Sequence, residues 1–303
     1  MSLADASRMI TQDGESNVRT ALVKAFEAWT TPYDIRPDGV FGSVAKVQCG
    51  QVTLSSDLLD FEFVVPFDDD LVPNEADITV YNLSDNTIKQ LKIGAALSIV
   101  AGYQDDTGVL FSGFISKVKT ERDGADKVTT IFAIDDIKEH TLESMAFSAG
   151  AKASDILRAL IEKTGIPVAV FKPRRDHVYK DAQTVDGELM TRIKEYAEVC
   201  GISVYVSRGK IYARYIKEGD NLNFRLSPET GMIGSPMSFT EEVQAEDFTE
   251  TIDGFEAEML LQHRICAGAI VNLDSVNAKG VFRVCSGKHI FSPDEAVTRI
   301  KMY

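Results

Sequence analysis

The chain has 303 residues, of which 44% are hydrophobic and 26% charged, as in an ordinary globular protein with room for two or three domains. Its 46 acidic and 32 basic residues give a formal net charge of −14, which repels phosphate and argues against unaided nucleic-acid binding. No apolar run approaches the roughly 20 residues that span a bilayer, and no signal-peptide pattern opens the sequence, so we expect cytoplasmic synthesis and no membrane association.

Residues 16–30 are predicted to form one amphipathic helix. Asn17 is available as its N-cap, and a polar stretch that follows, through Pro37-Asp38-Gly39, is typical of a linker. The apolar stripe consists of Val18, Ala21, Leu22, Ala25, Phe26 and Trp29. We expect this stripe to pack either on its own chain or on a neighbouring subunit.

From about residue 40 to 145 the hydrophobic period is two, which predicts half-buried strands of an antiparallel sheet or barrel. The alternating rows are Phe61, Phe63, Val65 and Phe67, then Leu97, Ile99, Ala101 and Tyr103, then Val128, Thr130, Phe132 and Ile134. Turns are expected at residues 104–108 and 122–124, and a bulge at Ser112-Gly113. A short helix, capped by Ser84 or Asp85, should end by Gly94.

Residues 146–215 change to a helical period. Helices are predicted over about 153–164 and 186–199, and each stops at a glycine, Gly165 or Gly201, that leads into a short strand. A hairpin at residues 207–210 closes this small α/β insertion. From residue 216 the strand signature returns, with Leu222, Phe224 and Leu226 alternating.

The predicted fold is therefore α+β and mainly β, with two tube-like antiparallel β-barrel domains flanking the α/β insertion and an N-terminal amphipathic helix. The expected boundaries are 1–39 for helix and linker, 40–145 for the first β-domain, 146–215 for the insertion and 216–303 for the second β-domain.

The sequence offers no constellation that would carry catalysis or hold a metal or cofactor. The cysteines, Cys49, Cys200, Cys266 and Cys285, are far apart in apolar stretches, as expected of buried free thiols. The histidines, His140, His177, His263 and His289, lie outside one another's helical or strand reach. Nucleotide-binding glycine loops and a Gly-x-Ser-x-Gly elbow are absent from the sequence. We expect no catalytic residues, no metal site and no cofactor.

The most unusual charge feature is an acidic stretch over residues 241–258 that contains no lysine or arginine. Its eight acids are Glu241, Glu242, Glu246, Asp247, Glu250, Asp253, Glu256 and Glu258. One interpretation is a solvated strand face or loop. The other is the acidic wall of a channel, or a docking patch.

Three stretches, in their order and spacing, carry motifs of one known family. The first contains Tyr81-Asn82-Leu83-Ser84 before the short helix, followed by the strands at 100–103 and 110–115. The second runs over residues 187–202, and the third combines residues 231–236, 260–265, 268–271 and 280–284. Together they resemble the baseplate hub family of tailed phages, which includes the late-control-D proteins and is related to the amino-terminal part of VgrG spikes.

The resemblance spans roughly residues 40–295 and leaves the helix at 16–30 outside the family pattern. It implies two tube-like β-domains arranged so that a trimer imitates the six-fold tail tube and joins it to a three-fold spike. The implied partners are other copies of the chain, a tail tube or distal tail protein and a spike or tail-tip protein, with the tape measure protein as a further candidate. DNA would only pass through, and the implied location is the virion tail baseplate, after synthesis in the bacterial host cytoplasm.

Two alternatives stay open at this point. One is another structural protein of a phage tail or injection device, such as a VgrG-like spike relative. The other is a tail-associated glycan-binding or wall-degrading protein, which would need an aromatic platform or a cleft with convergent carboxylates. Only one tryptophan, Trp29, is present, but nine tyrosines are available for stacking on sugars.

Overall fold

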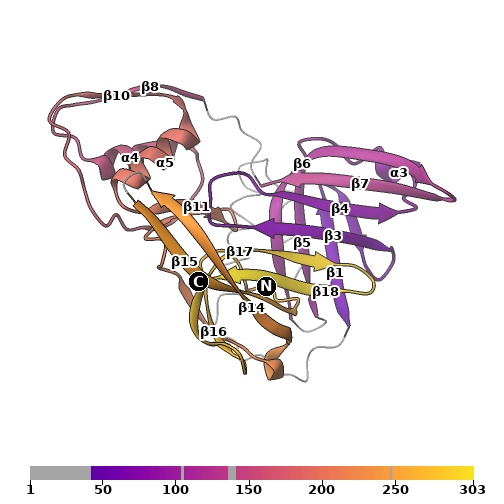
Figure 1. Cartoon of the computed structure of the whole chain (residues 1–303). Coiled ribbons are helices and arrows are strands. Elements are labelled where there is room, and N and C mark those ends of the chain that lie inside the picture. The colour runs from indigo at the N-terminus through magenta and orange to yellow at the C-terminus, as the bar shows by residue number, and fades with distance from the viewer. Residues whose placement is uncertain (1–41, 104–105, 136–140, 246–247) are drawn as a thin grey trace. The chain divides into compact units, whose positions relative to one another are not determined.

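A computed structural model of the chain describes residues 42–103, 106–135, 141–245 and 248–303. They divide into two compact units (Figure 1). The β unit comprises the described residues of Met1–Asp68, Pro73–Ile137 and Gly219–Tyr303, and the α/β unit those of Asp69–Val72 and Lys138–Glu218. The helix predicted at 16–30 lies outside the described residues. Among the described helices, none has the length and hydrophobicity that a membrane crossing requires.

The β unit consists of strands, the short helix α3 (Asp85–Ile88) and the 3-10 turn η2 (Pro228–Thr230). Its strands are β1 (Ser43–Cys49), β2 (Val52–Ser55), β3 (Phe61–Phe67), β4 (Glu75–Tyr81), β5 (Ala96–Tyr103), β6 (Asp106–Asp123), β7 (Asp126–Ile134), β13 (Asp220–Leu226), β14 (Met232–Ala245), β15 (Phe248–Leu260), β16 (Ala269–Asp274), β17 (Lys279–Phe291) and β18 (Ala296–Met302). They form one sheet in the order β14-β15-β18-β17-β3-β4-β7-β6-β5-β1-β2, which β16 joins through β17 and β13 through β16.

The mainly β, antiparallel character is confirmed, but the described strands do not form the two predicted barrels. Strand β3 pairs with β17, from Phe63 opposite Phe291 to Phe67 opposite Gly287, so both predicted β-regions contribute to one sheet. Among the described strands, the ladder ends at β2 and β14 without closing, and β13 pairs with β16 in parallel. Hydrophobic alternation predicts which side chains face a core, but it does not determine which distant strands pair.

Two apolar cores lie within the β unit. The first is formed by β1–β7 and includes Phe61 and Phe63, and Phe291 from β17 stacks on Phe63 with ring centroids 5.2 Å apart. The second is formed by β13–β18 and includes Leu226 and Ile300. The predicted inward row of β3 is confirmed at Phe61, Phe63 and Val65, and that of β5 at Leu97, Ile99 and Ala101.

In β7, however, the inward face is not the predicted one. Thr129, Ile131 and Ala133 are fully buried, whereas the predicted row of Val128, Thr130, Phe132 and Ile134 is half-buried. Both rows contain apolar residues, so the alternation is ambiguous there. On the outer face, the amine of Lys117 lies 5.4 Å from the centroid of the Phe132 ring.

The predicted bulge at Ser112-Gly113 is also displaced. Pairing shifts place the extra residues of β6 at Leu110, opposite β5, and at Ser116, opposite β7. Gly113 serves a different purpose, because a Cβ there would lie 2.1 Å from the backbone oxygen of Ile134. The glycine permits close backbone approach rather than marking a bulge.

The α/β unit contains α4 (Ala153–Lys163), α5 (Leu189–Val199), a three-stranded sheet and a two-stranded sheet. The first sheet has the order β11 (Ser203–Ser207), β12 (Lys210–Arg214) and β9 (Val168–Phe171); the second pairs β8 (Thr141–Phe147) with β10 (Gln183–Glu188). Both predicted helices are confirmed. The β11–β12 turn has positive φ at Arg208 (52°) and Gly209 (69°), as a tight two-residue hairpin requires. The predicted boundary at 145/146 falls within β8.

Candidate functional site

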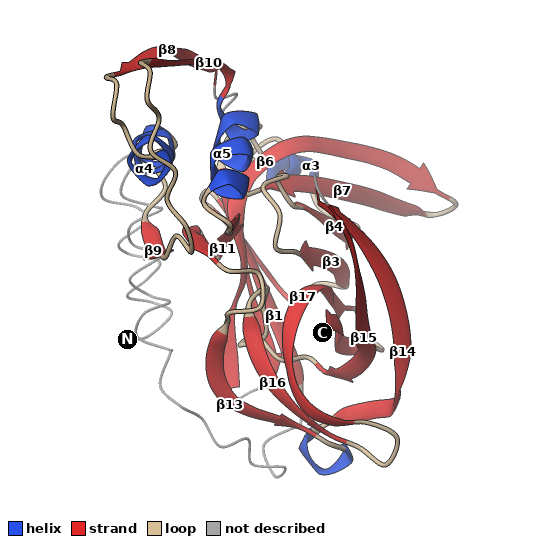
Figure 2. Ribbon diagram, turned by 60° about the vertical axis from the view of Figure 1, so that its left-hand side comes forward, coloured by secondary structure: helices blue, strands red, loops and turns tan. Residues whose placement is uncertain are grey.

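The acidic stretch lies on the long hairpin of β14 and β15, with β14 at the edge of the sheet (Figure 2). Glu246 and Asp247 lie outside the described residues, and so do the side chains of Glu242 and Glu250. The hairpin register divides the other four. Glu241, opposite Ile252, shares a face with Glu256 and Glu258, whereas Asp253 lies on the other face and accepts a hydrogen bond from the Thr240 hydroxyl at 2.7 Å.

The acids on the first face are paired with cations that the sequence stretch itself does not contain. Lys301 and Arg299 of β18 lie directly opposite Glu256 and Glu258. The Lys301 amine contacts Glu241 at 3.0 Å and Glu256 at 3.2 Å, and Arg299 contacts Glu258 at 2.5 Å. Hydrogen bonding to Glu241 and Glu256 raises the pKa of Lys301, and hydrogen bonding to Glu258 raises the pKa of Arg299.

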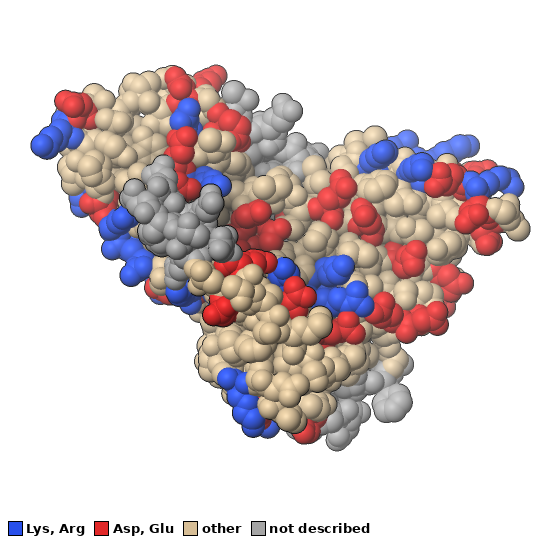
Figure 3. Space-filling view, in the orientation of Figure 1, with Lys and Arg blue, Asp and Glu red and all other residues tan. Residues whose placement is uncertain are grey.

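Charge therefore alternates on this face instead of forming a uniform acidic surface. Arg299 also contacts Glu295 at 3.1 Å, so two cations serve four carboxylates and leave the cluster with two excess negative charges. Figure 3 shows basic side chains among acidic ones over the strand labelled β18 in Figure 1. Because the pairs are exposed, their contribution to stability is small, and their main effect is on what can dock there.

Apolar side chains lie beside these ion pairs. Ile233 and Met237 lie opposite Glu258 and Glu256, with exposed fractions of 38% and 66%. The Lys301 amine also lies 5.1 Å from the centroid of the Phe239 ring. We call this surface the β14 face: Ile233, Met237, Phe239, Glu241, Glu256, Glu258, Arg299 and Lys301. Beyond it, β14 has no second strand partner among the described strands, so its outer backbone groups are open to pairing.

A second cluster, which sequence spacing did not reveal, joins the start of β6 to the loop after β15. Asp106 contacts His263 at 2.9 Å and Arg264 at 2.6 Å, although the partners are 157 and 158 residues away in sequence. Burial by itself would raise the pKa of Asp106, but the hydrogen bonds from His263 and Arg264 outweigh it and hold that pKa well below its usual range. Gly108 makes room for the ring, because a Cβ there would lie 1.9 Å from Nδ1 of His263.

The other histidines and the cysteines have ordinary structural environments. His289 is buried and hydrogen-bonds Thr298 at 2.9 Å, while His177 is exposed and packs edge-on to Tyr179. His140 lies outside the described residues. Cys49 and Cys200 are buried as expected, with burial raising the pKa of their thiols to about 12 and about 11, but Cys266 and Cys285 are only half-buried. Within the described ranges, no three His, Cys, Asp or Glu side chains are grouped to hold a metal ion.

The Tyr81-Asn82-Leu83-Ser84 motif has a clear structural basis. Asn82 has a φ of 57°, a left-handed conformation that asparagine tolerates. Its side chain donates to Asp126 and accepts from the Lys127 backbone, both at 3.0 Å. Leu83 enters the first core, and Ser84 caps α3 by accepting a hydrogen bond from Thr87. The motif thus fixes the chain between β4 and α3 against the β6–β7 hairpin.

Replacing Asn82 with alanine should lower the free energy of unfolding by about 1–2 kcal/mol, since it removes two hydrogen bonds and leaves a Cβ in a strained conformation. Asn82→Gly relieves the strain and should cost less than Asn82→Ala. Chemical denaturation of both variants provides the measurement. Equal losses would show that backbone conformation does not matter at this position.

No family model and no curated protein sequence matches the chain. Solved structures do match. The tail protein from Neisseria meningitidis superposes with a TM-score of 0.60 at 11% identity, covering 86% of this chain and 96% of that protein. The 43 kDa tail protein of prophage MuSo2 from Shewanella oneidensis gives 0.62 at 8% identity, with 86% and 97% covered.

A third match is an Escherichia coli component of the type VI secretion system, described as structurally similar to the T4 bacteriophage tail proteins gp27 and gp5. It superposes with a TM-score of 0.54 at 9% identity, covering 80% of this chain and 73% of that protein. Structural similarity at such low sequence identity establishes the fold alone. The chain has the fold of phage tail proteins and of a secretion-system component similar to gp27 and gp5, as its sequence resemblance to the baseplate hub family predicted.

Proposed function

We propose that the chain is a structural hub protein of a phage or phage-like baseplate and joins the tail tube to the central spike or tip. The shared fold is the observation that most supports this role, since the match extends over 96% and 97% of two tail proteins. The sequence motifs of the hub family support it independently. Such a role depends on interfaces and requires no catalytic group, metal or cofactor.

In this proposal the working form is a ring of three copies located in the tail baseplate, with a tail tube or distal tail protein on one side and a spike or tip protein on the other. The two cores of the β unit would be the centres of two tube-like domains, at residues 40–145 and 216–303, with 146–215 as the insertion. The open edge of β14 supports a head-to-tail contact between copies, because an uncovered long strand is otherwise prone to uncontrolled pairing.

The eight acids of residues 241–258 are proposed to form part of the channel wall. A negative wall repels phosphate, so DNA would pass without sticking. Together with Glu295, the acids of the β14 face exceed its two cations by two negative charges, which supports this assignment for Glu241, Glu256 and Glu258. Asp253 lies on the opposite face of the hairpin, so it would face the channel only where the hairpin is exposed on both sides.

Deleting the gene in the phage or prophage that encodes this chain tests the proposal. We expect lysates without complete tails, and restoration of tails by a plasmid copy. Electron microscopy of restored tails should locate the chain at the tip of the tube in three copies. Normal tails in the deletion strain would contradict the role, and two-fold packing would contradict the ring.

A further inference from the structure

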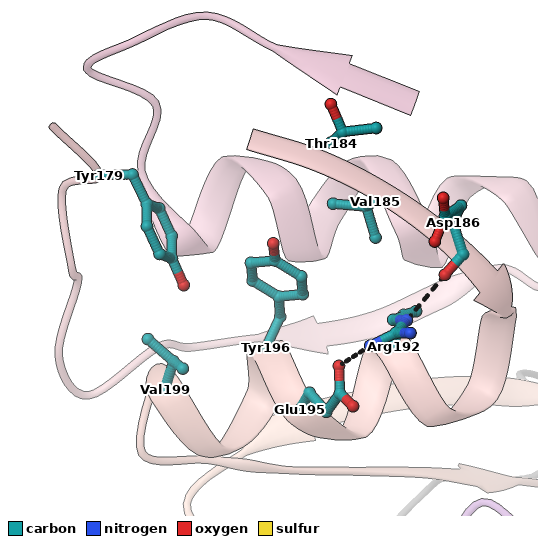
Figure 4. A pocket seen from close by; sticks show the side chains of 8 residues that line it. All are labelled: Tyr179, Thr184, Val185, Asp186, Arg192, Glu195, Tyr196 and Val199. Atoms are coloured by element: carbon teal, nitrogen blue, oxygen red, sulfur yellow. Dashed lines mark hydrogen bonds and ion pairs between the residues drawn. The ribbon is translucent and has the colours of Figure 1, made fainter. Parts of the chain in front are cut away.

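The α/β unit contains a polar pocket that the assembly role does not use. It lies between α5, β10 and the segment at Tyr179, and has a volume of about 280 Å³ (Figure 4). That is at or just below the roughly 300–1,000 Å³ of sites for drug-sized ligands, so the pocket suits one or two small rings. Its lining residues are Tyr179, Thr184, Val185, Asp186, Arg192, Glu195, Tyr196 and Val199.

Two tyrosine rings form a corner of this pocket. Tyr179 and Tyr196 have ring centroids 6.1 Å apart and planes inclined at 68°. The backbone of Tyr179 is held by two hydrogen bonds, from Gly150 at 2.8 Å and to Ala151 at 2.9 Å, and His177 packs edge-on against its ring. Tyr196 projects from α5 (Figure 4). Both rings are therefore positioned before any ligand arrives, which lowers the entropic cost of binding.

The polar groups around the rings alternate between donors and acceptors. Arg192 donates to the Asp186 backbone oxygen at 2.8 Å and to Glu195 at 2.7 Å, as Figure 4 shows. The phenol hydroxyls of Tyr179 and Tyr196 and the carboxylate of Asp186 have no hydrogen-bond partner within the described part of the chain. The site thus offers free hydroxyls and a free carboxylate beside aromatic faces.

This combination selects one chemical class. A sugar ring has apolar C–H faces that stack on aromatic rings, and hydroxyls that both donate and accept. Asp186, Glu195 and Arg192 sum to one negative charge, which disfavours phosphates and acidic sugars. Val185 is almost fully buried and Val199 half-buried, so little apolar surface remains for a lipid or an apolar ligand.

We propose that this pocket binds a short neutral saccharide, with the ring held against Tyr179 and Tyr196 and its hydroxyls donating to Asp186. Either a cell-wall glycan or a surface polysaccharide could supply such a ring. The proposal does not depend on the hub role, because it rests on the α/β unit alone.

The test is saturation-transfer NMR on the full chain. The probes are di-N-acetylchitobiose for wall glycan, and galactose and glucose for surface polysaccharide. We expect ring C–H signals from at least one probe, and a preference between the two groups identifies the source. Tyr179→Ala and Tyr196→Ala should each weaken binding at least tenfold, and Asp186→Asn about threefold.

Tyr81→Ala is the matched control, since it removes a half-buried tyrosine from the β unit; it should leave binding unchanged. Tyr179→Phe and Tyr196→Phe keep the rings and guard against a folding defect, so they should retain most of the stacking signal. The proposal is overturned if no probe gives a signal at probe concentrations up to about 10 mM, which is on the order of the dissociation constant of a very weak ligand. It is equally overturned if both alanine variants bind as the native chain does. Binding of a tetralysine peptide without binding of any saccharide probe would overturn it too.

Discussion

Replacing Asp106 with alanine is expected to lower the free energy of unfolding by about 2–3 kcal/mol. The carboxylate is the shared acceptor of His263, which is almost fully buried, and of Arg264, whose side chain is 19% exposed. Without it, the Arg264 guanidinium and the His263 imidazole lose this carboxylate acceptor in a poorly solvated position. We expect a smaller loss of stability than for a fully buried ion pair, because the Asp106 side chain is 22% exposed and water partly screens the interaction.

The pH dependence of this effect has a definite sign. Because the folded-state pKa of Asp106 is depressed, its contribution is present above its unfolded pKa of about 3.9 and is lost as the pH falls further. The native chain and Asp106→Ala should therefore differ most in stability near neutral pH and converge in strong acid. Denaturant titrations at pH 7, 4 and 2.5 measure this difference.

Asp85 provides a matched control, because its carboxylate contacts Lys127 at the same 2.6 Å but has an exposed side chain. Asp85→Ala should cause a much smaller loss at pH 7, since water screens the pair. A loss for Asp106→Ala no larger than that of Asp85→Ala would mean that the buried cluster does not stabilise the β unit. A difference that grows as the pH falls would contradict the sign.

How far the sequence could predict this fold is visible in its strands. In β3, apolar Phe61, Phe63 and Val65 alternate with Glu62, and the charged residue shows which face is outside. In β7 both faces carry apolar residues, so local pattern does not choose between Ile131 and Phe132. The β3–β17 pairing joins residues more than 200 positions apart, and no local signal encodes it.

The same limit applies to the sites. The acidic stretch is visible in the sequence because its charges lie close together in the chain, but its cations come from β18, opposite in register and 41 or more residues away. Asp106 and His263 are separated by 157 residues, so spacing gave no reason to connect them. The tyrosine corner likewise combines a loop residue with a helix residue. Contacts that depend on tertiary packing lie beyond periodicity and motif spacing.

The second large effect is expected at the β14 face. Changing Ile233 and Met237 together to lysine should reduce the yield of assembled tails at least tenfold in the complementation assay, equivalent to about 1.4 kcal/mol per contact. These apolar side chains are exposed on an edge strand, a place where isolated proteins favour charge to prevent pairing. Two added lysines would protect the edge and would also have to be desolvated in a contact between copies.

The control is the double change Leu58→Lys and Val276→Lys. Both side chains are more exposed than Met237, at 84% and 97%, but neither lies in β14. This variant should assemble as the native chain does. All four side chains are exposed, Ile233 the least of them, so both variants should unfold at a denaturant concentration close to that of the native chain. Loss of tails in the control too would point to general surface damage, whereas normal tails with both variants would show that the β14 face does not contact a neighbouring copy.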